Sequence, residues 1–224
     1  MARTTGSAPV VVRRSFAALT IALILIASVA LQRREARAAT FTVTTTLDAG
    51  AGSLRAAIEA ANAAPGADTI LFRIPTTDPG FAGGVFTIRP LSELPAVQGP
   101  TLLDGYSQTA FTGNTNPAGP EIVLNGALAG DAAGIQLSAP NSVLRGLVVN
   151  GFGTVGVVVA GDCRVEGCYL GTDAAGNAAV PNGGGNGLGS GLWLGGDGNR
   201  IGGTEARARN VISGNAHYGI FSSG

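Results

Sequence analysis

The sequence predicts an all-β protein, a solenoid of stacked parallel strands with an amino-terminal strand and a capping α-helix, preceded by a signal peptide. Short β-forming runs recur every 21 to 22 residues, and 36 glycines among 224 residues punctuate them without the three-residue period of collagen. A unit of that length is too short to enclose its own core. Neighbouring units must therefore stack on one another.

The first 38 residues are typical of a secretory signal. Arg13 and Arg14 precede an uncharged apolar run, residues 15–31, and residues 36–38 offer a small-x-small cleavage site. Residues 13–17 also resemble the twin-arginine motif. Because seventeen residues is near the short limit of a spanning helix, an uncleaved membrane anchor is the alternative. In both cases the sequence predicts a secreted or cell-surface protein.

The composition excludes nucleic acid as a partner. After residue 38, eight arginines and no lysine stand against thirteen acidic residues, a formal charge of −5, and no basic run follows. Nucleic-acid binding needs a basic patch, which this chain lacks. We expect membrane contact only through an uncleaved signal anchor, and the oligomeric state stays open.

Residues 39–75 are predicted to form an amino-terminal cap. Residues 41–46 have strand character, a turn follows, and Ser53 stands where a helix N-cap should. Apolar residues then recur at helical spacing up to residues 65–66, a Pro-Gly pair that ends the only helix the sequence predicts. Strand character returns at residues 69–72. The helix would cover the open end of the strand stack.

Residues 76–224 are predicted to form the strand stack, and two independent registers define its repeat. The first register recurs at residues 134–137, 156–159, 191–194 and 219–222. The second recurs at residues 144–149, 165–170 and, in broken form, 201–203 with 211–212. Alternation places Ile135, Val157, Leu192 and Ile220 on the inner side. Corners fall at Asn141, Asp162 and Gly198, residue types that tolerate left-handed backbone.

A family resemblance supports this interpretation. Residues 52–58 (GSLRAAI), followed by residues 62–70, resemble the amino-terminal domain of bacterial exported proteins named for a Cys-Ser-Leu-Arg-Glu-Ala (CSLREA) sequence, with Gly52 in place of Cys and Ala56 in place of Glu. Residues 103–108, 169–173 and 209–215 are similar to segments of the β-helix proteins that carry this domain. The resemblance implies a right-handed parallel β-helix of the pectin-lyase-like kind, with no settled activity.

No catalytic or metal-binding constellation is visible, and the sequence predicts no cofactor. The acidic residues stand singly and form no ladder across neighbouring units, whereas glycoside cleavage needs paired carboxylates. His217, the only histidine, lies in a glycine-flanked loop without a nucleophile elbow. Residues 184–189 and 195–200 approach the calcium β-roll repeat, but Gly189 and Arg200 stand where its aspartate belongs.

Cys163 and Cys168 leave two alternatives open. They lie five residues apart across one bend, so an exported protein could oxidise them to a disulfide. Alternatively, Cys168 aligns with the inward Leu147 and would serve as a small apolar core residue.

The outward positions of the first register are the candidate binding site: Gln136, Val158, Trp193 and Phe221. Exposed aromatic side chains in a row are suited to stacking on sugar rings or to a protein contact. The alternative is that the insertion at residues 172–190 folds over Trp193, or that the aromatic residues pack on further protein.

The sequence therefore predicts a secreted or cell-surface structural or binding module, adhesin-like or glycan-binding, with a polysaccharide or cell-surface ligand. The alternative is a polysaccharide lyase or glycoside hydrolase. Because the last predicted strand has no polar cap after it, we also expect the stack to continue in a longer protein.

Overall fold

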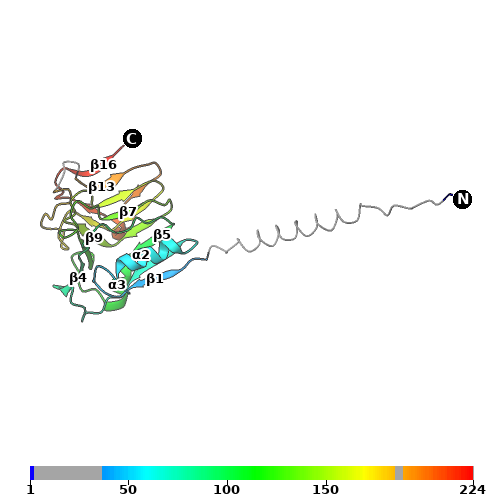
Figure 1. Cartoon of the computed structure of the whole chain (residues 1–224). Helices are drawn as coiled ribbons and strands as arrows, with labels where there is room; N and C mark the ends of the chain where they lie inside the picture. The colour runs from blue at the N-terminus through cyan, green and yellow to red at the C-terminus, as the bar shows by residue number, and fades with distance from the viewer. Residues whose placement is uncertain (3–36, 185–188, 224) are drawn as a thin grey trace. The chain divides into compact units, whose positions relative to one another are not determined.

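The computed structural model describes residues 1–2, 37–184 and 189–223 (Figure 1). The chain divides into two units, Met1–Glu35 and Ala36–Gly224, and the elements below belong to the second. The predicted signal peptide, residues 1–38, lies almost wholly outside the described residues. None of the helices formed by the described residues has the length and apolar character needed to cross a membrane.

Three sheets of mostly parallel strands make up the second unit. The first sheet has the strand order β1 (Thr40–Val43), β2 (Asp68–Phe72), β5 (Thr101–Asp104), β8 (Val143–Arg145), β11 (Arg164–Glu166) and β14 (Arg200–Ile201). The second has the order β16 (Tyr218–Ser222), β13 (Ser190–Leu194), β10 (Val157–Val159) and β7 (Ile135–Leu137). The third has the order β15 (Val211–Ile212), β12 (Tyr169–Leu170), β9 (Leu147–Asn150), β6 (Ile122–Asn125), β4 (Val85–Ile88) and β3 (Phe81–Ala82).

These sheets correct the predicted fold class. The all-β, right-handed parallel β-helix solenoid is wrong for the part of the chain that the structure describes, which forms three parallel-rich sheets with two α-helices, an α/β-like arrangement without a closed solenoid. The physical reason lies in residues 76–121, which precede the repeat. They contribute irregular segments, including an antiparallel pair, β3 with β4, that no stack of equivalent units would contain.

Where the repeat does run, the predicted pairing of individual strands is confirmed. Val157 lies opposite Ile135 on one side and Leu192 on the other, and all three strands are parallel. In the first sheet Val165 lies between Leu144 and Ile201. The predicted corners also adopt left-handed backbone, with φ of 63° at Asn141, 50° at Asp162 and 73° at Gly198.

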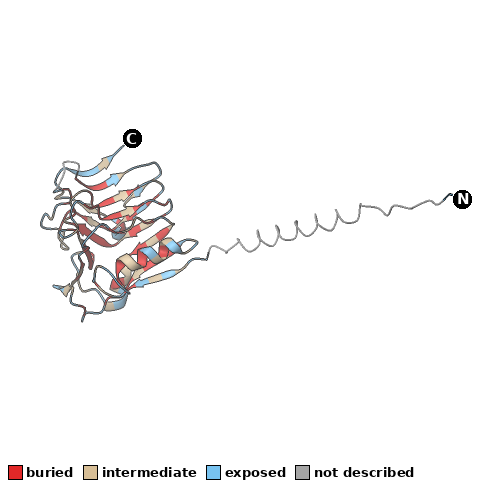
Figure 2. Cartoon of the chain, viewed as in Figure 1, coloured by how far each residue is buried: buried red, intermediate tan, exposed pale blue. Residues whose placement is uncertain are grey.

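The inner residues of these strands form the core, shown in red in Figure 2. Val157 and Leu192 are completely buried, as the alternation predicts. Ile220 departs from that prediction, because it is 47% exposed. It belongs to β16, the edge strand of its sheet, and no described strand lies beyond it to cover its side chain.

The predicted helix is present as α2 (Leu54–Ala63). Its N-cap Ser53 accepts a hydrogen bond from the Ala56 amide, which satisfies one of the free donors of the first turn. The apolar side of α2 is buried and packs on β1 and β2. The helix therefore covers the amino-terminal edge of the first sheet.

A second helix, α3 (Tyr106–Thr112), corrects the expectation of a single helix. Its residues have low helix propensity, so the sequence pattern did not show it. Tertiary contacts hold it in place, since the buried Gln108 accepts a hydrogen bond from the Ile74 amide and donates one to the Ile74 carbonyl. A short 3₁₀ turn, η1 (Ala206–Ala208), lies between β14 and β15.

Candidate functional site

The structure brings the four predicted site residues into one row on the outer face of the second sheet. Val158 pairs in register with Gln136 and with Trp193, and Trp193 pairs with Phe221 on β16. Strict alternation along each strand places these side chains opposite the buried Val157 and Leu192. The row crosses all four strands of the sheet.

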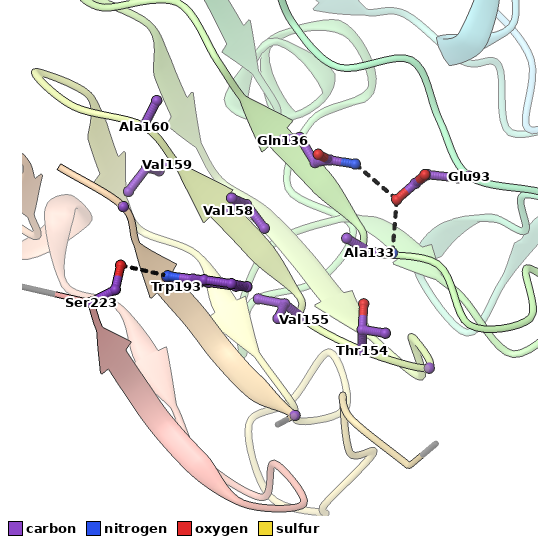
Figure 3. A pocket seen from close by; sticks show the side chains of 13 residues that line it. Glu93, Ala133, Gln136, Thr154, Val155, Val158, Val159, Ala160, Trp193 and Ser223 are labelled. Atoms are coloured by element: carbon purple, nitrogen blue, oxygen red, sulfur yellow. Dashed lines mark hydrogen bonds between the residues drawn. The ribbon is translucent and has the colours of Figure 1, made fainter. Parts of the chain in front are cut away.

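A groove of about 680 Å³ follows this row (Figure 3). Its lining is mostly apolar and consists of Glu93, Ala133, Gln136, Gly153, Thr154, Val155, Val158, Val159, Ala160, Gly189, Trp193, Gly195 and Ser223. Three of the four predicted site residues therefore line it. Phe221 does not, but it contacts Trp193 from the neighbouring strand.

Trp193 presents a large aromatic surface to this groove. Trp193 is 36% exposed, so the described part of the insertion at residues 172–190 does not bury it. Among the described residues of that insertion, Gly189 contributes to the groove lining.

Neighbouring side chains fix the orientation of the indole ring. Its Nε1 donates a hydrogen bond to Ser223 Oγ at 3.2 Å, and Phe221 meets it edge-on, with ring centroids 5.9 Å apart. Tyr218 packs against Phe221 at 5.6 Å and is 48% exposed. The exposed aromatic surface is thus wider than the repeat predicts, because Tyr218 extends it.

Glu93 is the one ionisable side chain that lines the groove among the described residues. Its Oε1 accepts hydrogen bonds from Gln136 Nε2 at 2.8 Å and from the Ala133 amide at 3.3 Å. Figure 3 shows the side chains of Glu93 and Gln136 pointing toward one another. The sequence pattern does not reveal Glu93, because this residue precedes the repeat and lies 43 residues before Gln136 in the chain.

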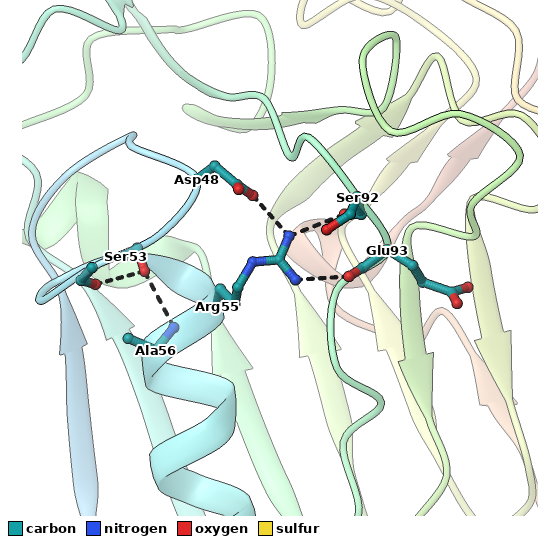
Figure 4. A network of polar contacts seen from close by, with 7 residues as sticks. Asp48, Ser53, Arg55, Ala56, Ser92 and Glu93 are labelled. Atoms are coloured by element: carbon teal, nitrogen blue, oxygen red, sulfur yellow. Dashed lines mark hydrogen bonds and ion pairs between the residues drawn. The ribbon is translucent and has the colours of Figure 1, made fainter.

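The segment that carries Glu93 is held by α2 (Figure 4). Arg55 donates from Nη1 to the Glu93 carbonyl at 2.7 Å and from Nη2 to the Ser92 carbonyl at 3.0 Å. Its Nη2 also pairs with Asp48 Oδ1 at 2.8 Å. Helix α2, which packs on β1 and β2, therefore positions the main chain of a groove residue.

Two acidic residues outside the groove lining, Asp48 and Asp104, form ion pairs with arginines. Asp104 forms a bidentate pair with Arg145, at 2.8 and 2.7 Å, and this hydrogen bonding raises the pKa of Arg145. His217 is exposed, in the turn before β16. Within residues 37–184 and 189–223, no three His, Cys, Asp or Glu side chains are placed to share a metal ion.

The two cysteines are free and buried, so the structure favours the core alternative over the disulfide. Burial raises the pKa of the Cys168 thiol to about 12.

Comparison with known proteins does not assign this chain to a family. A scan against protein-family models found no match, and a search of curated proteins found none. The resemblance of residues 52–70 to the CSLREA domain therefore stays a prediction.

Proposed function

We propose that this protein is a secreted or cell-surface binding module that takes a glycan in the groove beside Trp193, as an adhesin-like protein would. The observation that carries the proposal is the indole ring of Trp193, partly exposed in an apolar groove whose volume is in the range of small-ligand sites. Sugar rings present flat C–H faces that stack on aromatic rings, and they surround those faces with hydroxyl groups.

The polar groups of the groove suit those hydroxyl groups. The Gln136 carboxamide, the Glu93 carboxylate and the Thr154 hydroxyl all lie in its lining and can exchange hydrogen bonds with a sugar. Gln136 and Glu93 already bond to each other, so their positions are set before a ligand arrives. A site of this kind loses less conformational entropy on binding.

The test uses Trp193, the only tryptophan of the chain, as probe and as target. Titration of the full chain with a panel of soluble glycans should change its intrinsic fluorescence. Trp193→Ala, followed by calorimetry, should weaken binding about tenfold or more, since the lost aromatic contact is worth about 1.4 kcal/mol.

Phe111→Ala is the matched control, because Phe111 is 48% exposed on α3 and lies outside the groove lining. It should leave affinity unchanged. If Trp193→Ala binds every glycan as the wild type does, or if no glycan binds, the proposal fails.

The alternative of a polysaccharide lyase or glycoside hydrolase has no observation in its favour. Hydrolysis by paired acids needs a second carboxylate near the first, and Glu93 stands alone among the described residues of the groove. Chromatography of the bound glycan after long incubation would reveal cleavage products if the chain were such an enzyme.

A further inference from the structure

We infer that the groove selects glycans by charge: it favours chains of amino sugars and disfavours polyuronates, because Glu93 places a negative charge in its lining and Arg55 positions Glu93. This inference rests on the proposed function and adds the chemical class of the ligand.

The charge of Glu93 is not cancelled by its described surroundings. The two groups that donate to its Oε1, an amide side chain and a main-chain amide, are both neutral. The ion pairs among the described residues join Arg55 to Asp48 and Arg145 to Asp104, so neither involves Glu93. A ligand in the groove therefore meets one net negative charge from the lining.

Arg55 supports Glu93 without neutralising it. Its guanidinium donates hydrogen bonds to the main-chain carbonyls of residues 92 and 93. These bonds hold the main chain of Glu93 in place, and with it the start of the Glu93 side chain. Its own charge is paired with Asp48, and both side chains are largely buried, with 16% and 19% of their surface exposed. Figure 4 shows the Glu93 carboxylate pointing away from this pair. Arg55 is thus a positioning residue.

The same geometry indicates which sugars fit. An ammonium group on a sugar beside Gln136 would be attracted to the Glu93 carboxylate, while another ring of the same glycan stacks on Trp193, two strands away in the sheet. A uronate carboxylate would be repelled by Glu93 and would find no cationic side chain among the described lining residues. At separations near 4 Å in a water-exposed groove, one such charge changes affinity about fivefold in each direction.

The experiment compares three hexasaccharides of matched length: a glucosamine oligomer, a neutral cello-oligosaccharide and an oligogalacturonate. Trp193 fluorescence gives the Kd of each for the full chain at low salt. We expect the glucosamine oligomer to bind most tightly and the oligogalacturonate least tightly. The spread between them should shrink in high salt, because exposed charges are screened.

Glu93→Gln keeps the size of the side chain and an oxygen acceptor but removes the charge. We expect it to reduce the ratio of the oligogalacturonate Kd to the glucosamine Kd about fivefold or more, and to change the neutral Kd less than twofold. Glu59→Gln, an exposed glutamate of α2 outside the groove lining, should leave the ratio unchanged. An unchanged ratio in Glu93→Gln would overturn the charge selection.

Arg55→Met tests the positioning role. It should lower the same ratio, and this effect should vanish when Glu93 is already glutamine, because the two residues act through one group. An equal effect in both backgrounds would refute that role. If Arg55→Met does not fold, Arg55→Lys replaces it and should lower the ratio less than Glu93→Gln does.

The outcomes separate the two proposals. If none of the three oligosaccharides binds, the charge selection fails, and the wider glycan panel decides whether the proposed function fails as well. If all three bind with equal Kd in a manner that depends on Trp193, only the charge selection fails.

Discussion

At the level of single residues, the cysteines offer a direct check on the core. Cys163 and Cys168 are both completely buried, and the pKa of Cys168 lies at about 12 because its thiol is removed from water. The thiolate is the reactive form, so a buried thiol with a raised pKa reacts slowly. We expect no reaction of the folded chain with an aromatic disulfide reagent at pH 8.

Denaturant should expose both thiols and release two equivalents per chain. One or two fast equivalents from the folded chain would contradict the burial. No reaction even in denaturant would show that the cysteines are joined in a disulfide after all.

Some residues of the candidate site could be predicted from the sequence and others could not. Gln136, Val158, Trp193 and Phe221 were predictable together because strand alternation and a shared period fix both their side of the sheet and their neighbours. Glu93 reaches the groove through a fold contact between distant segments, and no local period encodes such a contact. Tyr218 was missed because it lies outside the row, although it packs on Phe221.

At the level of elements, the start of α2 depends on a glycine. Gly52 has φ of 81°, and a Cβ at this position would collide with Thr44 Oγ1. Gly50 has a similar φ of 91°, but a Cβ there would meet open space. An alanine at Gly50 therefore tests backbone strain alone, whereas an alanine at Gly52 tests backbone strain together with steric overlap.

We expect Gly50→Ala to destabilise the protein by about 1 kcal/mol, from left-handed strain alone. Gly52→Ala should cost more, about 2–3 kcal/mol, because Thr44 must also move. Urea unfolding followed by circular dichroism measures both. If both variants lost the same free energy of unfolding, Thr44 would be able to move aside without cost, and the predicted collision would not destabilise the fold.

The elements also show why part of the fold was predictable. Ser53 and the apolar spacing after it predicted α2, and the two repeat registers predicted the parallel pairing around Val157. Helix α3 was not predictable, since its stability comes from the buried bonds of Gln108 to Ile74 rather than from its own sequence. The all-β solenoid was wrong because a period seen after residue 134 was extended to segments that do not share it.

At the level of the whole molecule, Asp78 joins the chain after β1 to the loop before β3. It accepts hydrogen bonds from the Thr45 hydroxyl at 2.9 Å, the Thr46 amide at 3.2 Å and the Gly80 amide at 2.9 Å, as well as one from the Thr46 hydroxyl. Burial acts to raise the pKa of this carboxyl, but the hydrogen bonds together outweigh it and hold the pKa below its usual value. The charged form is therefore the one that the folded state prefers.

This preference gives the stability of the protein a dependence on acid pH. A carboxyl whose pKa is lower in the folded state stabilises the fold fully above its unfolded pKa, about 3.9, and the contribution is lost as the pH falls through the lower folded value.

Asp78→Asn should cost about 1–3 kcal/mol at pH 7, because two or more acceptor bonds are lost or weakened. The difference in unfolding free energy between wild type and Asp78→Asn should stay constant from pH 7 to about pH 5 and shrink below about pH 4. Urea unfolding at each pH measures it, with Asp197→Asn as the control for removal of an exposed carboxylate. A difference that persists unchanged at pH 2.5 would show that shape and packing, rather than the carboxylate charge, account for the role of Asp78.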